Sequence, residues 1–203
     1  MDTTMPQILA VCTGNICRSP AIERLLAANL QGLVTVGSAG TAAVVGASIS
    51  RPMKALLYEA GADTDNFAAR QITPALINQA DLILTAATTH RSAIVDLQPT
   101  AVHRTFTLLE FAARLHFVDL PGLTGTLNRD SLQALVRQAH QARPRLRPTT
   151  TDVPDPYRQD PEVYDTVFAM ITQAVSSIVQ VLTAISAQPP TVPPPMAGGG
   201  TAN

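Results

Sequence analysis

The segment VCTGNICRSP at residues 11–20 constrains the fold of this chain more than any other stretch. It follows an apolar run at residues 8–11, typical of a buried strand, and precedes a helical pattern at residues 20–30. We expect Ser19 to cap that helix and Pro20 to take its first position. A loop between a strand and a helix directs backbone N–H groups and the positive end of the helix dipole at one point, which suits an anion. The sequence therefore predicts an anion-binding loop.

Apolar runs and helical patterns alternate along the rest of the chain. Strands are predicted at residues 8–11, 34–36, 81–85 and 102–107, with the small residues 37–40 ending the second strand. Helices are predicted at residues 20–30, 52–60, 74–80, 89–95, 108–115, 129–141 and 162–186. This alternation is typical of an α/β fold with an open, mostly parallel four-stranded sheet and helices on both faces. Such sheets bind ligands at the carboxyl ends of their strands, where the loop at residues 11–20 would lie.

Length and composition favour one domain. The chain has 203 residues, of which 46% are hydrophobic, enough for one sizeable core, and we expect the domain to cover residues 1–187. Residues 188–203 are rich in proline and glycine, so we expect a disordered tail. The helix at residues 162–186 carries no charge from Thr166 onward, which makes a membrane span the alternative. Its internal polar residues favour a core helix without stable membrane insertion.

Charge and cysteine content limit the partners and the compartment. The formal net charge of -1 argues against nucleic acid as the partner. The opening residues MDTTMPQ lack the pattern of a signal peptide, so we expect a cytoplasmic protein with reduced thiols. The four histidines are scattered without ligand spacing, and the chain has only two cysteines, so no metal site is predicted.

The residue types in the loop suit a phosphate with a nucleophile beneath it. Gly14 lets the backbone curl, and Asn15 tolerates left-handed backbone angles. Arg18 offers a planar fork that matches two phosphate oxygens. Cys12 lies six residues before Arg18, so the loop can encircle one phosphate above the Cys12 sulfur. A helix N-terminus and a nearby cation favour the thiolate, which is the nucleophilic form, and Ser19 is placed to donate a hydrogen bond to it.

VCTGNICRSP resembles the phosphate-binding loop of the low-molecular-weight protein tyrosine phosphatases, whose pattern is V-C-x-G-N-[I/T]-C-R-S-P. Residues 37–41, 69–72 and 81–85 agree in order, and the longer stretch at about 115–150 resembles the extended bacterial branch. The resemblance implies a phosphomonoester hydrolase that holds phosphate or another oxyanion and needs no metal or organic cofactor. It implies that the substrate is bound by Thr13, Gly14, Asn15, Ile16, Cys17 and Ser19.

The same resemblance implies a second catalytic group, an aspartate followed by proline and an aromatic residue. Asp155, Pro156 and Tyr157 match that pattern. Cys12 would attack phosphorus to form a cysteinyl-phosphate, and Arg18 would stabilise the phosphate oxygens. Asp155 would protonate the leaving oxygen and then deprotonate the water that releases phosphate. Tyr157 would form an apolar wall for the substrate ring.

Two further residues, Asp152 and Cys17, lie next to those that the motifs single out. Asp152 lacks the following proline and aromatic residue, and we interpret it as a surface carboxylate. Cys17 is adjacent to Arg18 and should point away from the phosphate, so a buried structural thiol stays as open for it as a functional one. A functional Cys17 would trap oxidised Cys12 as a reversible disulfide.

The chain departs from the family at one wall of the cleft. Family members usually have a large aromatic residue after the Ser-Ala-Gly-Thr run, whereas residues 42–48 here are small or aliphatic, and the chain has no tryptophan. The preference for phosphotyrosine over other aryl phosphates therefore stays open.

Two other functions are compatible with this fold. Arsenate reductases linked to thioredoxin need two further cysteines, which are absent. A non-catalytic phosphotyrosine-binding module would be expected to lack Cys12, Arg18 or Asp155, and all three are present. The expected substrate is a phosphotyrosine protein, with a bacterial tyrosine kinase as one candidate that the sequence does not select over others.

Overall fold

Four parallel strands form the centre of the structure, a computed structural model that describes residues 5–123, 125–142 and 150–187. They are β1 Gln7–Cys12, β2 Thr35–Gly40, β3 Leu82–Thr85 and β4 Thr105–Thr107. The spatial order is β2-β1-β3-β4, and each neighbouring pair is parallel. The predicted α/β fold with a parallel four-stranded sheet is therefore confirmed.

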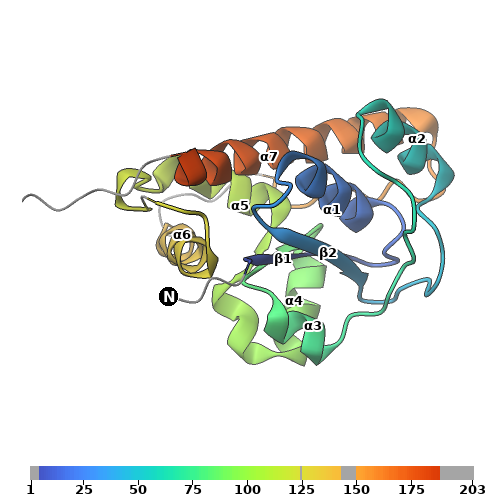
Figure 1. The fold of residues 1–203 in the computed structure, drawn as a ribbon. Helices are drawn as coiled ribbons and strands as arrows, with labels where there is room; N and C mark the ends of the chain where they lie inside the picture. The colour runs from blue at the N-terminus through green and yellow to red at the C-terminus, as the bar shows by residue number, and fades with distance from the viewer. Residues whose placement is uncertain (1–4, 124, 143–149, 188–203) are drawn as a thin grey trace, which may run out of the picture.

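Helices cover both faces of this sheet (Figure 1). One face carries α1 Arg18–Asn29, α2 Arg51–Glu59, α5 Leu108–Arg114 and α7 Pro161–Ala187, and the other carries α3 Pro74–Gln79 and α4 Thr88–Leu97. α6 Arg129–Gln141 packs against β3 and the short 3-10 helices η1 Pro99–His103, η2 Leu115–Phe117 and η3 Pro121–Leu123. Because neighbouring strands are parallel, the carboxyl ends of all four strands, and the loops that follow them, lie at the same end of the sheet.

The side chains of β1 divide between the two layers. Ile8 and Ala10 belong to the large core cluster under α1 and α7, whereas Leu9 and Val11 belong to the smaller cluster under α3 and α4. Because both faces are covered, the strand is apolar at every position from Ile8 to Cys12 rather than at alternate ones. Its end is thereby fixed on both sides, and the loop that follows starts from a rigid position.

β2 extends further than the sequence predicted. Residues 37–40, expected to end the strand, pair with β1 from Leu9 to Cys12. A Cβ atom on Gly40 would lie 2.4 Å from the carbonyl oxygen of Thr13, so only glycine lets β2 run this close to the loop. The small residues that indicated a turn therefore serve a close backbone approach instead.

Two other local predictions are wrong. α1 begins at Arg18 with Cys17 as its N-cap and no side-chain cap, so Ser19 lies inside the first turn rather than capping it. β4 covers only Thr105–Thr107, because Pro99–His103 forms the 3-10 helix η1. The hydroxyl of Ser19 is hydrogen bonded within the loop, as described below, and is not available as a cap.

α7 is the element for which a membrane span was the alternative. Within the described residues it is the helix long and apolar enough to cross a bilayer. One stripe of it, from Tyr164 to Ile185, is buried, and the helix packs against α1, α2 and α5. It is a core helix of this fold. The predicted tail at residues 188–203 lies outside the described residues, and the boundary at residue 187 stays a prediction.

Candidate active site

The segment that follows β2 fixes the backbone of the loop between β1 and α1. Four of its N–H groups donate to loop carbonyls: Thr41 to Cys12 at 2.9 Å, Ala42 to Thr13 at 3.0 Å, Val44 to Gly14 at 3.0 Å and Ser50 to Ile16 at 2.8 Å. In a trans peptide the N–H of the next residue points opposite to the carbonyl, and no cis peptide occurs in the described chain. The loop thus presents N–H donors, and not carbonyls, on its other side, as an anion requires.

Cys12 lies at the base of this loop, at the end of β1. Its side chain is 2% exposed, and its Sγ is 3.0 Å from the hydroxyl of Ser19 in the first turn of α1. The amide of Asn15 donates to that same hydroxyl at 2.9 Å. Because Ser19 accepts this hydrogen bond, its own proton can be donated to a Cys12 thiolate, with the carbonyl oxygen of Ala39 at 3.5 Å as the other acceptor within reach.

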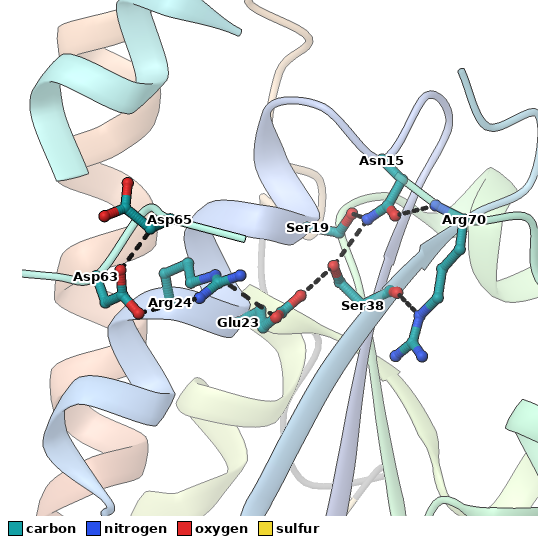
Figure 2. A network of polar contacts seen from close by, with 8 residues as sticks. All are labelled: Asn15, Ser19, Glu23, Arg24, Ser38, Asp63, Asp65 and Arg70. Atoms are coloured by element: carbon teal, nitrogen blue, oxygen red, sulfur yellow. Dashed lines mark hydrogen bonds and ion pairs between the residues drawn. The ribbon is translucent and has the colours of Figure 1, made fainter. Parts of the chain in front are cut away.

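The orientation of Asn15 is set by the rest of a buried network (Figure 2). Asn15 has a φ of 55°, in the left-handed region predicted for it. Its Oδ1 accepts from the backbone N–H of Arg70 at 2.9 Å, which turns Nδ2 toward Ser19 and toward Ser38, the latter at 2.8 Å. Ser38 in turn donates to the carboxylate of Glu23 in α1. Burial raises the pKa of Glu23, while the hydrogen bond from Ser38 opposes that shift.

Arg18 is a buried cation at the rim of the loop. Its Nη1 donates to the carbonyl of Val153 at 3.1 Å, and its Nη2 is 2.9 Å from Oδ2 of Asp155. Its Nε is buried and has no partner among the described residues. A guanidinium with an unused buried donor beside a ring of N–H groups is suited to an added oxyanion.

Asp155 and Tyr157 reach the same place from the far end of the chain. Asp155 accepts from the Tyr157 N–H at 3.3 Å through Oδ1 while Oδ2 contacts Arg18. The Tyr157 ring is 45% exposed and stacks with the Arg158 guanidinium at 5.2 Å. The carboxyl group of Asp155, which the sequence predicts to act together with the loop, therefore lies against the loop.

A cavity of about 200 Å³ joins these groups. It is lined by Cys12, Thr13, Gly14, Ile16, Cys17, Arg18, Ala42, Val44, Asp155 and Tyr157. Every predicted site residue lines it except Asn15 and Ser19, which lie beneath the loop at 0% exposure. One wall is formed by the aromatic ring of Tyr157. The other, where family members usually have a large aromatic residue, is formed here by Ala42 and Val44.

Cys17 lies on the inner side of the loop. It is 3% exposed, and its thiol donates to Ser50 Oγ at 3.1 Å. Burial raises the pKa of Cys17, and the charges of Cys12 and Asp155 act in the same direction, while the hydrogen bonds with Ser50 and Tyr164 oppose the shift. The structure therefore favours a protonated thiol at this position.

Sequence reasoning missed three side chains of the site. Ser38 links Asn15 to Glu23, and His90 in α4 is 2.8 Å from Thr13 Oγ1 through Nε2. Burial lowers the pKa of His90 to about 4, and the charge of Arg18 acts in the same direction. Asp152, interpreted as a surface carboxylate, is half-buried and accepts hydrogen bonds from Thr88. Each depends on a contact between distant segments; the sequence had singled out Asp152 and the stretch around Ser38, but not His90.

Comparison with known proteins agrees with this geometry. A family model for low molecular weight phosphotyrosine protein phosphatase matches residues 7–122, a range that contains the loop and ends before Asp155. The low molecular weight protein-tyrosine-phosphatase Wzb of Salmonella typhi is 27% identical over 183 residues, covering 90% of this chain and 98% of the relative.

Solved structures extend the likeness to the fold. Vibrio vulnificus Wzb in complex with benzylphosphonate has a TM-score of 0.65 and 28% identity, covering 87% of this chain and 99% of that one. The arginine phosphatase YwlE from Geobacillus stearothermophilus has a TM-score of 0.67 and 27% identity, covering 88% of this chain and 93% of that one. The relatives thus include phosphatases for two kinds of phosphorylated side chain.

Proposed function

The chain belongs to the low molecular weight phosphotyrosine protein phosphatase family, and we propose that it hydrolyses phosphotyrosine and other aryl phosphates through a phosphorylated Cys12. The observation that supports this most is the meeting of Cys12, Arg18 and Asp155 at one cavity. A nucleophile, an anion-binding cation and a proton donor are the groups that a phosphomonoester needs.

In the first step the Cys12 thiolate attacks phosphorus from the base of the loop. The S–P bond forms as the bond from phosphorus to the aryl oxygen breaks, and that oxygen leaves with the electron pair and takes the proton of Asp155. The loop N–H groups and Arg18 stabilise the equatorial phosphate oxygens. The apolar wall at Tyr157 accommodates the ring.

In the second step water replaces the leaving group. The Asp155 carboxylate takes a proton from water, whose oxygen bonds to phosphorus. The S–P bond breaks and returns its electron pair to Cys12, where the hydroxyl of Ser19, 3.0 Å away, stabilises the thiolate. Inorganic phosphate leaves, and the proton on Asp155 restores the acid for the next cycle.

The walls of the cavity favour an aryl group over a guanidinium. Beyond the loop backbone they are Ile16, Ala42, Val44 and Tyr157. Asp155 is the one carboxylate among the lining residues, and it already faces Arg18. A phosphoarginine side chain would place its cationic group against walls that are apolar apart from Asp155, which costs free energy. Phosphotyrosine is therefore the substrate class we propose, although one relative is an arginine phosphatase.

The protein substrate and the compartment are further parts of this proposal. We propose a phosphotyrosine protein, such as a tyrosine kinase, as the substrate, and the cytoplasm as the compartment. Both cysteines are free thiols in the structure, which suits a reducing environment. Arsenate reduction is not favoured, because the family matched is a phosphatase family and its acid motif is present at Asp155.

Turnover of p-nitrophenyl phosphate in the presence of a chelator tests the chemistry. We expect the wild type to be active, Cys12→Ser to be inactive and Asp160→Ala, which removes an exposed carboxylate from the segment of Asp155, to match the wild type. Peptides with phosphotyrosine and with phosphoarginine in one sequence context then test the substrate class. Faster release of phosphate from the phosphoarginine peptide would overturn the aryl assignment and leave the chemistry intact.

A further inference from the structure

α4 begins without a cap of its own. Its N-cap residue is Ala87, which offers no side-chain hydrogen bond, and its first turn has no acidic residue. The N–H of Thr88 instead donates to Oδ1 of Asp152 at 2.9 Å, and the Thr88 hydroxyl donates to Oδ2 at 3.0 Å. A carboxylate 64 positions away in the chain thus takes the place of the missing cap.

Asp152 stands at the start of the segment that bears Asp155. The next residue, Val153, donates its N–H to the carbonyl of Ala86 at 2.7 Å and accepts from Arg18 at 3.1 Å. Asp155 follows two positions later and contacts Arg18. The side chain of one residue and the backbone of the next therefore attach this segment to the turn between β3 and α4.

The same turn is also attached to the phosphate loop. The N–H of Ala86 donates to the carbonyl of Val11 in β1 at 2.8 Å. His90, in the first turn of α4 and 6% exposed, is 2.8 Å from Thr13 Oγ1 through Nε2. The first turn of α4 therefore contacts both the loop that holds the nucleophile and the segment that holds the acid, and it fixes the distance between them.

We propose that Asp152 is a positioning residue for the general acid: by capping α4 it holds Asp155 where its proton meets the leaving oxygen. This inference rests on the proposed function, since it requires Asp155 to be the acid. Asp152 is not among the residues that line the cavity, so it acts through Asp155 and not on the substrate.

The dependence of kcat/KM on the leaving group separates this role from a purely structural one. p-Nitrophenolate is a stable anion that needs little protonation, whereas an unsubstituted phenolate, like that of tyrosine, needs it strongly. We expect Asp152→Ala to change kcat/KM for p-nitrophenyl phosphate less than about twofold. For phenyl phosphate we expect Asp152→Ala to lower kcat/KM about tenfold. This is less than the loss of roughly 100-fold or more in kcat/KM that we expect for Asp155→Ala.

Three further variants complete the design. Asp152→Asn should recover most of the activity, because the amide oxygen still accepts from the Thr88 N–H and the amide N–H can donate to its hydroxyl. Asp96→Ala removes an exposed carboxylate from the other end of α4 and should match the wild type with both substrates. In the Asp152→Ala/Asp155→Ala double variant we expect no loss beyond that of Asp155→Ala alone.

Two results would overturn the inference, and they differ from each other. In the first, Asp155→Ala loses kcat/KM selectively for phenyl phosphate, but Asp152→Ala lowers kcat/KM equally for both substrates, or its loss adds fully to that of Asp155→Ala. Asp152 would then only stabilise the fold. The backbone bonds of Val153 would then suffice to position the acid. If Asp155→Ala itself shows no selective loss, the acid assignment within the proposed function fails first. Urea unfolding of each variant checks that all are folded under the assay conditions.

Discussion

Arg18 and Asp155 form a direct ion pair across the mouth of the cavity, with 2.9 Å between Nη2 and Oδ2, although the arginine side chain is 6% exposed and the aspartate 54%. An oxyanion in the loop and this carboxylate therefore compete for one guanidinium. The pair also holds the proton donor beside the site before substrate arrives.

Removal of the Asp155 carboxylate should strengthen oxyanion binding while it weakens turnover. Asp155→Ala frees Nη2 of Arg18 and removes a negative charge next to the anion. We expect inorganic phosphate or vanadate to inhibit this variant at several-fold lower concentrations than the wild type, while kcat/KM for phenyl phosphate falls about 100-fold or more. Inhibition constants measured at one ionic strength provide the test. Weaker inhibition in the variant would show that Asp155 does not compete for Arg18.

Asn15 allows its backbone and side-chain roles to be separated. Asn15→Gly keeps the φ of 55° accessible but loses the hydrogen bonds to Ser19, Ser38 and Arg70, whereas Asn15→Ala loses them and strains the backbone. The strain is about 1–2 kcal/mol, and the added freedom of glycine in the unfolded chain offsets about 0.4–1 kcal/mol of it. We expect the alanine variant to have a free energy of unfolding about 0.5–1 kcal/mol lower than the glycine variant. A urea titration that ranks them in the opposite order would contradict this.

His90 should make stability depend on pH below neutrality. Its pKa is about 4 in the folded protein against 6.5 for the ordinary group, because burial and Arg18 disfavour the imidazolium while Asp155 and Asp152 oppose them only partly. The unfolded chain therefore binds this proton first, so the stabilisation is full above pH 6.5 and is lost as the pH falls toward 4. At about 1.4 kcal/mol per pKa unit the loss is on the order of 3 kcal/mol.

His90→Gln isolates that effect, because its amide can still meet Thr13 but does not titrate. We expect the free energy of unfolding of the wild type to fall relative to this variant between about pH 6.5 and 4, and to run parallel to it above pH 7. Parallel curves over the whole range would mean that His90 binds its proton equally well in the folded and unfolded chain, so that folding does not lower its pKa, and the assignment would fail.

The role of the aliphatic wall of the cavity can be tested by adding an aromatic side chain to it. Val44 is half exposed and lines the cavity, so Val44→Tyr should supply a second aromatic surface opposite Tyr157. We expect a several-fold lower KM for phenyl phosphate with kcat little changed, since stacking on a ring contributes about 0.5–1.5 kcal/mol. Val45→Tyr is the matched control, because Val45 is 70% exposed and is not a lining residue. Equal effects from both variants would remove Val44 from the substrate cleft.

The sequence predicted the strand, loop and helix around Cys12 because the residues that form them are contiguous. It also predicted Asp155, because a short motif marks it. It did not predict the contacts of His90 with Thr13 or of Asp152 with Thr88, since each joins segments more than 60 positions apart and depends on how β3 and α4 pack. Ser19 shows the opposite error. A serine before a proline indicated a cap, but the buried network of Asn15 engages the hydroxyl more strongly.

The parts of the site lie far apart in the chain, which affects the order in which they form during folding. Arg18 and Val153 are 135 positions apart, and contacts that close so long a loop form late, because the entropy of closure precedes the gain. A growing chain therefore carries the residues of β1, its loop and α1 long before it carries Asp155. Until that aspartate reaches the loop, the acid and base of the proposed reaction are missing. Catalytic competence therefore requires that the segment of Asp155 has docked on Arg18, and the appearance of activity during refolding would report that step.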